Sequence, residues 1–237
     1  MEIKEIASPH SETFKRLNAI RQGKFKAEGL TLIEGRDLLD EAKRANCLVA
    51  SLATRREDLV GAKEGYILPA HLLERLSVFS TPAGIMGIAK LNLTKETGDK
   101  FIYLDGVQDP GNVGTIIRTA LCFGYTSVMV SKDSASLSNI KTIQASKGAI
   151  FRLPVGYMEY EELLASPAHL YLTILEGQDE REIPALEKPC CLVFGNEGRG
   201  IPAGHRQRGT GIRIDMGHFD SLNVASAAAI FMYRFKD

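Results

Sequence analysis

The chain has 237 residues, which is long for one domain and comfortable for two. Its 29 lysines and arginines balance 29 aspartates and glutamates, so no global basic field marks it for nucleic acid or an anionic membrane. No signal-like segment follows Met1 and no apolar run approaches the length of a membrane span, so we expect a soluble, cytoplasmic protein that does not enter a membrane.

The first part of the chain alternates between short apolar runs and helical patterns, which is typical of an α/β protein. A helix is predicted to start near Ser8, with Pro9 in its first turn. Further elements are predicted at 31–35 (strand), 36–46 (helix), 47–53 (strand), and across 66–70, 71–77 and 85–91. Residues 92–100 are polar, contain Gly98 and show no periodicity, so they are the best candidate for a linker.

A second alternating set follows the linker. Strands are predicted at 101–107, 127–131, 153–155, 170–177, 190–195 and 211–216, and helices at 112–124, 139–150, 159–166 and 221–235. Strands joined by helical crossovers indicate a mostly parallel sheet that is covered on both faces. Such sheets bind ligands at the carboxyl ends of their strands.

The four cysteines indicate no metal site. They form no CxxC pair and have no matching histidine spacing, which argues against a disulfide framework or a zinc site. We therefore expect reduced, buried thiols and no metal.

Three loops are rich in glycine or small polar residues, and each follows a predicted strand: LDGVQDPGNVG (104–114), FGNEGRGIP (194–202) and IDMGHFDSLNVAS (214–226). Each also has a plain structural reading. Asp109 and Pro110 form a good helix start, GNEGRG could be a simple strand exit, and Ser221 could cap a helix. A dinucleotide or nucleoside-triphosphate site is disfavoured, because neither G-x-G-x-x-G nor the P-loop pattern is present.

Arg118 is the one charged residue between Asn112 and Phe123, within an apolar run that we expect to be packed. An unpaired cation inside such a helix is costly. Its presence indicates either a reaction site or a salt bridge to a buried acidic residue.

The three loops carry a family resemblance. QDPGNVGTIIRTALCFG (108–124), LVFGNEGRGI (192–201) and SLNVASAAAI (221–230) resemble, in order and spacing, the three motifs of the SpoU/TrmH branch of the SPOUT RNA methyltransferases. SKGAIFRLPV (146–155) is similar to the segment between the first two motifs, and residues 8–42 resemble, more loosely, an L30e-like substrate-binding domain. The segment TPAGIMGIAK (81–90) resembles the end of that domain, with Ala83 where the family usually has glutamine.

The resemblance implies an α/β fold in two parts. Residues 1–92 would form the smaller L30e-like RNA-binding domain, 93–100 a linker, and 101–237 a SPOUT-type parallel-sheet domain tied in a trefoil knot. It also implies a homodimer that transfers a methyl group from S-adenosylmethionine to a ribose 2′-hydroxyl of RNA, with rRNA favoured over tRNA. The rival interpretation is a dimer that binds structured RNA without catalysis.

The resemblance also assigns residues to roles. Arg118, Asn112, Ser221 and Asn223 match catalytic or polar motif positions. Arg118 would act either as a base or as a fixed cation that stabilises alkoxide charge, and its very high intrinsic pKa favours the second role. The expected donor pocket contains Gly195, Asn196, Glu197, Gly200, Ile214, Met216 and Leu222, with a structural role favoured for Glu197. The expected RNA contacts are Lys15, Arg16, Arg21, Lys24 and Lys26.

Two positions depart from the third motif of the family. Asp215 stands where the family usually has proline, and Ala225 where it has serine. An acidic group or a lost hydroxyl near the donor pocket could alter the affinity for the donor.

Overall fold

A computed structural model describes residues 2–217 and 221–236 of the chain. These residues form two compact units. The first unit runs to Asn92 and includes Ser138–Arg152, and the second comprises Leu93–Leu137 and the chain from Leu153 onward. The expected domain limits at 1–92 and 101–237 stay a prediction, as do the L30e-like character of the first part and the knot in the second.

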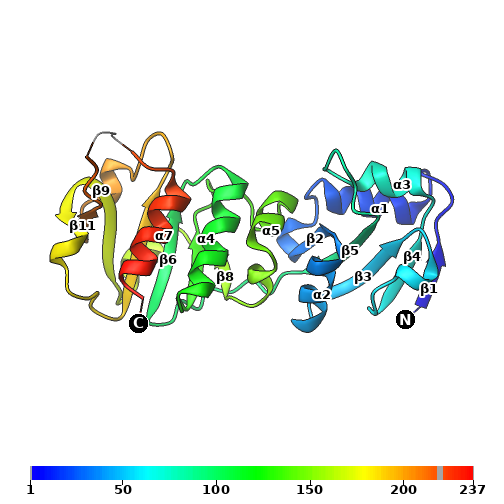
Figure 1. The fold of residues 1–237 in the computed structure, drawn as a ribbon, viewed down its shortest axis with the longest axis horizontal. Helices are drawn as coiled ribbons and strands as arrows, with labels where there is room; N and C mark the ends of the chain where they lie inside the picture. Colours follow the sequence, from blue (N-terminus) through cyan, green and yellow to red (C-terminus); the bar gives the residue numbers. More distant parts are fainter. Residues whose placement is uncertain (1, 218–220, 237) are drawn as a thin grey trace. The chain divides into compact units, whose positions relative to one another are not determined.

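The first unit is built on a five-stranded mixed sheet in the order β1-β4-β3-β5-β2 (Figure 1). Its strands are β1 (Glu2–Glu5), β2 (Leu30–Glu34), β3 (Leu48–Ala53), β4 (Glu64–Ile67) and β5 (Ile85–Lys90). Strand β5 runs antiparallel to both β2 and β3, and the other pairs are parallel. We did not predict β1 from the sequence, since EIKE is short and largely polar.

Helices cover both faces of this sheet. On one face, α1 (Glu12–Arg21) and α3 (Ala70–Leu76) bury apolar side chains in one cluster with alternate residues of the strands. On the other face, α2 (Arg36–Arg44) brings Leu39 against Gly87 of β5. The short helix α5 (Ile140–Ser146) belongs to this unit and lies against β2.

The second unit is a six-stranded sheet in the order β11-β9-β10-β6-β7-β8, and every pair in it is parallel. Its strands are β6 (Lys100–Asp105), β7 (Ser127–Val130), β8 (Val155–Tyr157), β9 (His169–Asp179), β10 (Cys190–Gly195) and β11 (Thr210–Arg213). The predicted parallel α/β sheet is therefore confirmed. Crossover helices explain the parallel pairing, because they return the chain to the same end of the sheet each time.

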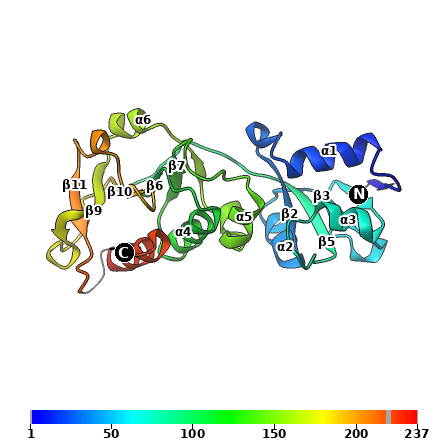
Figure 2. The same cartoon turned by 90° about the horizontal axis from the view of Figure 1, so that it is seen from above.

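Helices flank this second sheet on both faces (Figures 1 and 2). Helices α4 (Pro110–Cys122) and α7 (Val224–Arg234) lie side by side on one face, where the Phe231 ring meets Phe194 of β10. Helix α6 (Tyr160–Ala165) packs on the opposite face in a cluster with β6, β7, β9 and β10. The strand order reverses between β6 and β10, and a reversal of this kind opens a crevice at the carboxyl ends of the strands.

Some predicted boundaries were wrong. Helix α1 begins at Glu12 rather than near Ser8, because the side chain of Ser11 accepts the amide of Phe14 and caps the helix. The last strand ends at Arg213, before the predicted 216. Within the described ranges no helix has the length and apolar character to cross a bilayer.

Candidate active site

The three motif loops leave the carboxyl edge of the second sheet, after β6, β10 and β11. The loops after β6 and β10 touch directly: the side-chain amide of Asn196 donates to the carbonyl of Gly106 over 2.8 Å. The sequence predicted that these loops open on one edge of the sheet, and the structure confirms it.

One chain of side-chain hydrogen bonds joins all three loops. The amide of Asn112 donates to the Glu197 carboxylate over 3.0 Å, and the amide of Asn223 donates to the Asn112 oxygen, also over 3.0 Å. Glu197 additionally accepts the backbone amides of Gln108 and Asp109 at 3.2 Å each. Asn112 therefore sits between the second and third motifs and fixes their spacing.

The environment of Glu197 favours its charged form. Partial burial by itself would raise the pKa of this carboxyl, but the hydrogen bonds from Asn112 and from the backbone amides outweigh it and hold the pKa below its ordinary value. Glu197 is thus an anion that organises a loop, in line with the structural role expected from the sequence.

Two residues of the motif loops, Asp109 and Asn223, also cap helices. Asp109 caps α4 by accepting the amide of Asn112 at 2.8 Å, with Pro110 in the first turn. Helix α7 is capped by Asn223, which accepts the amides of Ala225 and Ser226, and not by Ser221 as the sequence suggested. Capping and site formation use the same side chains here.

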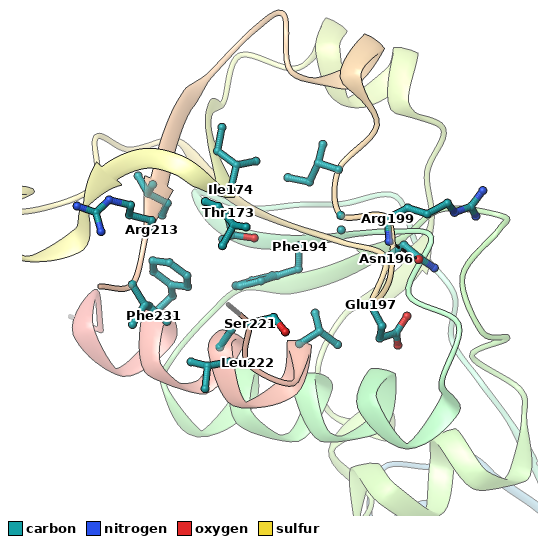
Figure 3. A pocket seen from close by; sticks show the side chains of 18 of the residues that line it. Thr173, Ile174, Phe194, Asn196, Glu197, Arg199, Arg213, Ser221, Leu222 and Phe231 are labelled. Atoms are coloured by element: carbon teal, nitrogen blue, oxygen red, sulfur yellow. Dashed lines mark hydrogen bonds between the residues drawn. The ribbon is translucent and has the colours of Figure 1, made fainter. Parts of the chain in front are cut away.

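A cavity of about 320 Å³ lies beside Glu197, which is one end of this hydrogen-bond chain (Figure 3). Its walls include every expected donor-pocket residue, namely Gly195, Asn196, Glu197, Gly200, Ile214, Met216 and Leu222, and also Ser221. Further walls are apolar, from Ile174, Phe194, Ile201, Ile212, Val224 and Phe231. Apolar walls with a few convergent polar groups are typical of small-molecule sites.

Gly195 and Gly200 shape the loop after β10. A Cβ atom at this position would lie 2.3 Å from the backbone of Gly200 and of Ile201, so the missing side chain lets the loop fold back on the strand. Gly200 has a φ of +64°, a conformation that glycine adopts without strain. The two glycines therefore set the shape of a loop that lines the cavity, and their part in binding the donor stays a prediction.

The side chain of Asp215, where the family usually has proline, does not line the cavity. Ile214 and Met216 line the cavity, whereas the Asp215 carboxylate binds Arg181 at 2.9 Å and Arg213 at 3.2 Å. Arg181 also binds Asp179, and this contact lowers the pKa of the Asp179 carboxyl. The acidic residue thus fastens the loop to the neighbouring segment and does not present charge to a bound molecule.

The structure does not bring Arg118 into the cavity. Its side chain is exposed on the outer face of α4, and within the described ranges it has neither a hydrogen bond nor an ion pair. The packed environment expected from the sequence was wrong, and so was the alternative of a buried salt bridge. Cys122 is exposed on the same face, whereas Cys47, Cys190 and Cys191 are buried as predicted.

The expected RNA contacts lie in the first unit, on and just after α1. Lys15, Arg16, Lys24 and Lys26 are exposed, and Arg21 is half-buried with its guanidinium donating to Asn18. Their role in binding stays a prediction.

Sequence reasoning missed one wall of the cavity. Residues 173–176, from the middle of β9, line it together with Arg199, Arg206 and Arg213. The signal was available, since Thr173 and Glu176 interrupt an apolar strand just before Gly177. Gly211 of β11 pairs with Leu172 of β9, and the next residue, Ile212, pairs with Gln178. The β9 residues between these two partners bulge out of the ladder, toward the cavity.

Comparisons with known proteins identify the family of this chain. The model of the SpoU rRNA methylase family matches residues 99–233. The 23S rRNA (guanosine(2553)-2′-O)-methyltransferase RlmP of Bacillus subtilis is 32% identical, over 99% of this chain and 100% of its own length. The 23S rRNA (guanosine-2′-O-)-methyltransferase RlmB of Xylella fastidiosa is 35% identical over 56% of each chain.

A solved structure is similar over nearly the whole chain. An AdoMet-bound rRNA methyltransferase from Sinorhizobium meliloti superposes with a TM-score of 0.85 at 26% identity, covering 98% of this chain and 97% of its own. Matching motifs, a family model over more than half of the chain and full-length similarity lead to one conclusion: the chain belongs to the SpoU rRNA methylase family.

Proposed function

We propose that this protein transfers the methyl group of S-adenosylmethionine to the 2′-hydroxyl of a ribose in ribosomal RNA, in the cytoplasm. The observation that carries the proposal is the Glu197–Asn112–Asn223 hydrogen-bond chain, which gathers the three motif loops beside one cavity. The names of the relatives from Bacillus subtilis and Xylella fastidiosa, both rRNA guanosine 2′-O-methyltransferases, support the choice of substrate.

The cavity fits the methyl donor. Its volume of about 320 Å³ lies in the range of small-molecule sites, and its apolar walls suit an adenine ring. Asn196, Glu197 and Ser221 are polar residues among its walls (Figure 3). When bound, S-adenosylmethionine supplies an electrophilic methyl group on a positively charged sulfur.

The polar residues divide into two roles. Asn112 and Asn223 use their side chains on each other, on Glu197 and on the α7 cap, so they position the loops. The Ser221 hydroxyl faces the cavity and is exposed, so it remains available to the substrate. Arg118 supplies a permanent cation that stabilises the developing alkoxide, because an arginine side chain stays protonated at neutral pH.

The proposed enzyme is a homodimer in which α4 and α7 meet the partner. Ile230 and Tyr233 of α7 are 41% and 58% exposed, which is unusual for apolar residues on a solvated face. The ring of Tyr233 packs on Phe123 at the end of α4, which makes the faces of the two helices continuous. Arg118 belongs to this face and not to its own cavity, so a second copy would complete the site.

The first unit would supply affinity for RNA through the lysines and arginines of α1 and the turn after it. Phosphate contacts of this kind strengthen binding without choosing the sequence.

The decisive experiment compares ribose-methylation maps of ribosomal RNA from a deletion strain and its parent, and then restores the missing mark in vitro with purified protein and labelled donor. One 2′-O-methyl group should be absent from the deletion strain and should return with the protein. Calorimetry with S-adenosylmethionine distinguishes the alternative of an RNA-binding dimer without catalysis. Unchanged maps together with no donor binding at millimolar concentration would refute the proposal.

A further inference from the structure

The segment after β10 forms one wall of the cavity, and it contains a histidine, His205, that does not itself line the cavity. Ile201 and Arg206 both line the cavity, and His205 lies between them in a single short turn (Ala203–His205). The Arg206 guanidinium donates to the carbonyl of Ile201 over 2.8 Å and closes this stretch into a compact loop. Contacts that fix the position of His205 therefore also fix the positions of Ile201 and Arg206.

The imidazole of His205 is tied to the central strand of the sheet. Its Nδ1 lies 2.6 Å from Oδ2 of Asp105, the last residue of β6. The Asp105 side chain is only 8% exposed and that of His205 is 29% exposed. A carboxylate this deeply buried requires a partner, because leaving it without one costs the full desolvation penalty.

Tyr160 holds the same histidine by ring stacking and through its hydroxyl. The two rings are stacked, with centroids 3.7 Å apart and planes 9° from parallel. The Tyr160 hydroxyl also donates a hydrogen bond to the backbone carbonyl of His205. Tyr160 is the first residue of α6, so the turn is fastened to a strand and to a helix at once.

We infer that His205 is a positioning residue for the donor cavity, acting through Asp105 and Tyr160 on Ile201 and Arg206. The inference rests on the proposed function, since it concerns the same donor site. Asp105 directly precedes Gly106, whose carbonyl binds Asn196 of the second motif. The contact therefore fixes the second motif loop to the strand from which the first motif loop starts.

The test separates the hydrogen bond from the stacking. His205→Phe keeps a flat ring against Tyr160 and removes the bond to Asp105, whereas His205→Asn keeps a donor near the position of Nδ1. His169→Phe is the matched control. That histidine bonds Thr210 at 2.8 Å and packs on Tyr171, but it lies at the amino end of β9, away from the cavity.

The readouts are calorimetric affinity for S-adenosylmethionine, affinity for ribosomal RNA, KM and kcat, and the thermal midpoint of unfolding. His205→Phe should weaken donor binding about tenfold and raise the donor KM, because a shift of about 1 Å in a binding wall has effects of this size or larger. RNA affinity should stay within about twofold, since we expect the first unit to supply most phosphate contacts. His205→Asn should recover donor affinity to within about threefold, and His169→Phe should resemble the wild type.

The outcomes discriminate clearly. Wild-type donor affinity in a folded His205→Phe protein, alongside a wild-type enzyme that binds the donor, would overturn the inference and leave the proposed function standing. Equal losses of donor affinity in His205→Phe and His169→Phe would also overturn it. So would a loss in His205→Phe that is just as large in His205→Asn. Absence of donor binding by the wild type would overturn the proposed function and the inference together. Should His205→Phe fail to fold, Asp105→Asn tests the same bond from the other partner.

Discussion

Replacing Arg118 by alanine should separate catalysis from folding. The side chain is exposed and forms no ion pair within the described part of the chain, so its loss should change the free energy of unfolding by no more than about 0.5 kcal/mol. Loss of one fixed group that stabilises an oxyanion lowers kcat by about 10² to 10³, or roughly 3 to 4 kcal/mol of activation free energy. The stability and activity of this variant should therefore diverge.

The assay measures methyl transfer under single-turnover conditions, with donor affinity by calorimetry and stability by urea denaturation. Arg118→Ala should bind the donor like the wild type, because Arg118 does not line its own cavity. Arg118→Lys keeps the charge but loses the planar fork, so partial activity would show how much of the effect is electrostatic. Arg56→Ala, another exposed arginine without an ion pair in the described ranges, is the control.

A mixing experiment tests whether Arg118 serves the partner's cavity. Arg118→Ala dimers are dissociated and reassociated with a variant whose cavity is blocked, such as Met216→Arg. If the arginine acts across the dimer, random mixing at equal amounts restores activity to about a quarter of the sites, since half of the dimers are mixed and one site in each is complete. Wild-type turnover by Arg118→Ala alone would refute the site, and no restoration on mixing would refute the crossed arrangement.

Three further predictions concern the loops around the cavity. Asn112→Ala removes two hydrogen bonds of 3.0 Å and should lower the free energy of unfolding by about 1 to 2 kcal/mol in urea denaturation, since each exposed bond contributes at the low end of its range. The pKa of Glu197 is depressed in the folded state, so the stability its charge contributes is present above the unfolded pKa of about 4.3 and is lost as the pH falls through the folded pKa. The stability gap between wild type and Glu197→Gln should thus be wide at neutral pH and shrink in acid, and a gap that is constant with pH would contradict this. Asp215→Ala should weaken donor binding by no more than about threefold at low salt and not at all at high salt, because its ion pairs are solvent-exposed and screened.

The sequence predicted the architecture well where local patterns are strong. Alternation of short β-branched runs and helical segments predicted the parallel sheet of the second unit, and the sheet then predicted that the three loops share an edge. Boundaries were weaker. Strand β1 was missed because Glu2–Glu5 is an edge strand of largely polar residues. It forms by pairing with β4, which is about 60 residues away in the sequence, and not from a local pattern.

The wrong expectation for Arg118 has an identifiable cause. The run from 112 to 123 is apolar in composition, and composition alone suggested packing on all sides. The buried residues of α4 include Val113, Ile116, Ile117 and Ala120, which follow the spacing i, i+3, i+4, i+7 of a single face. Arg118 falls outside that face, so the helical period predicts exposure where composition predicted burial.

The contact between His205 and Asp105 marks the limit of prediction from one sequence. The two residues are 100 positions apart, and although Asp105 opens the first loop, no pattern in the sequence pairs it with His205. The three motif loops could be grouped because each carries a recognisable run after a strand, and Asn112, Glu197 and Asn223 then meet as that grouping implies. A histidine in a loop has no such neighbour in sequence, and its partner follows only when the strand order places β6 next to β10. The motif residues that line a site are thus predictable from local sequence, whereas the wall from β9 and the residues that hold the walls in place depend on the fold.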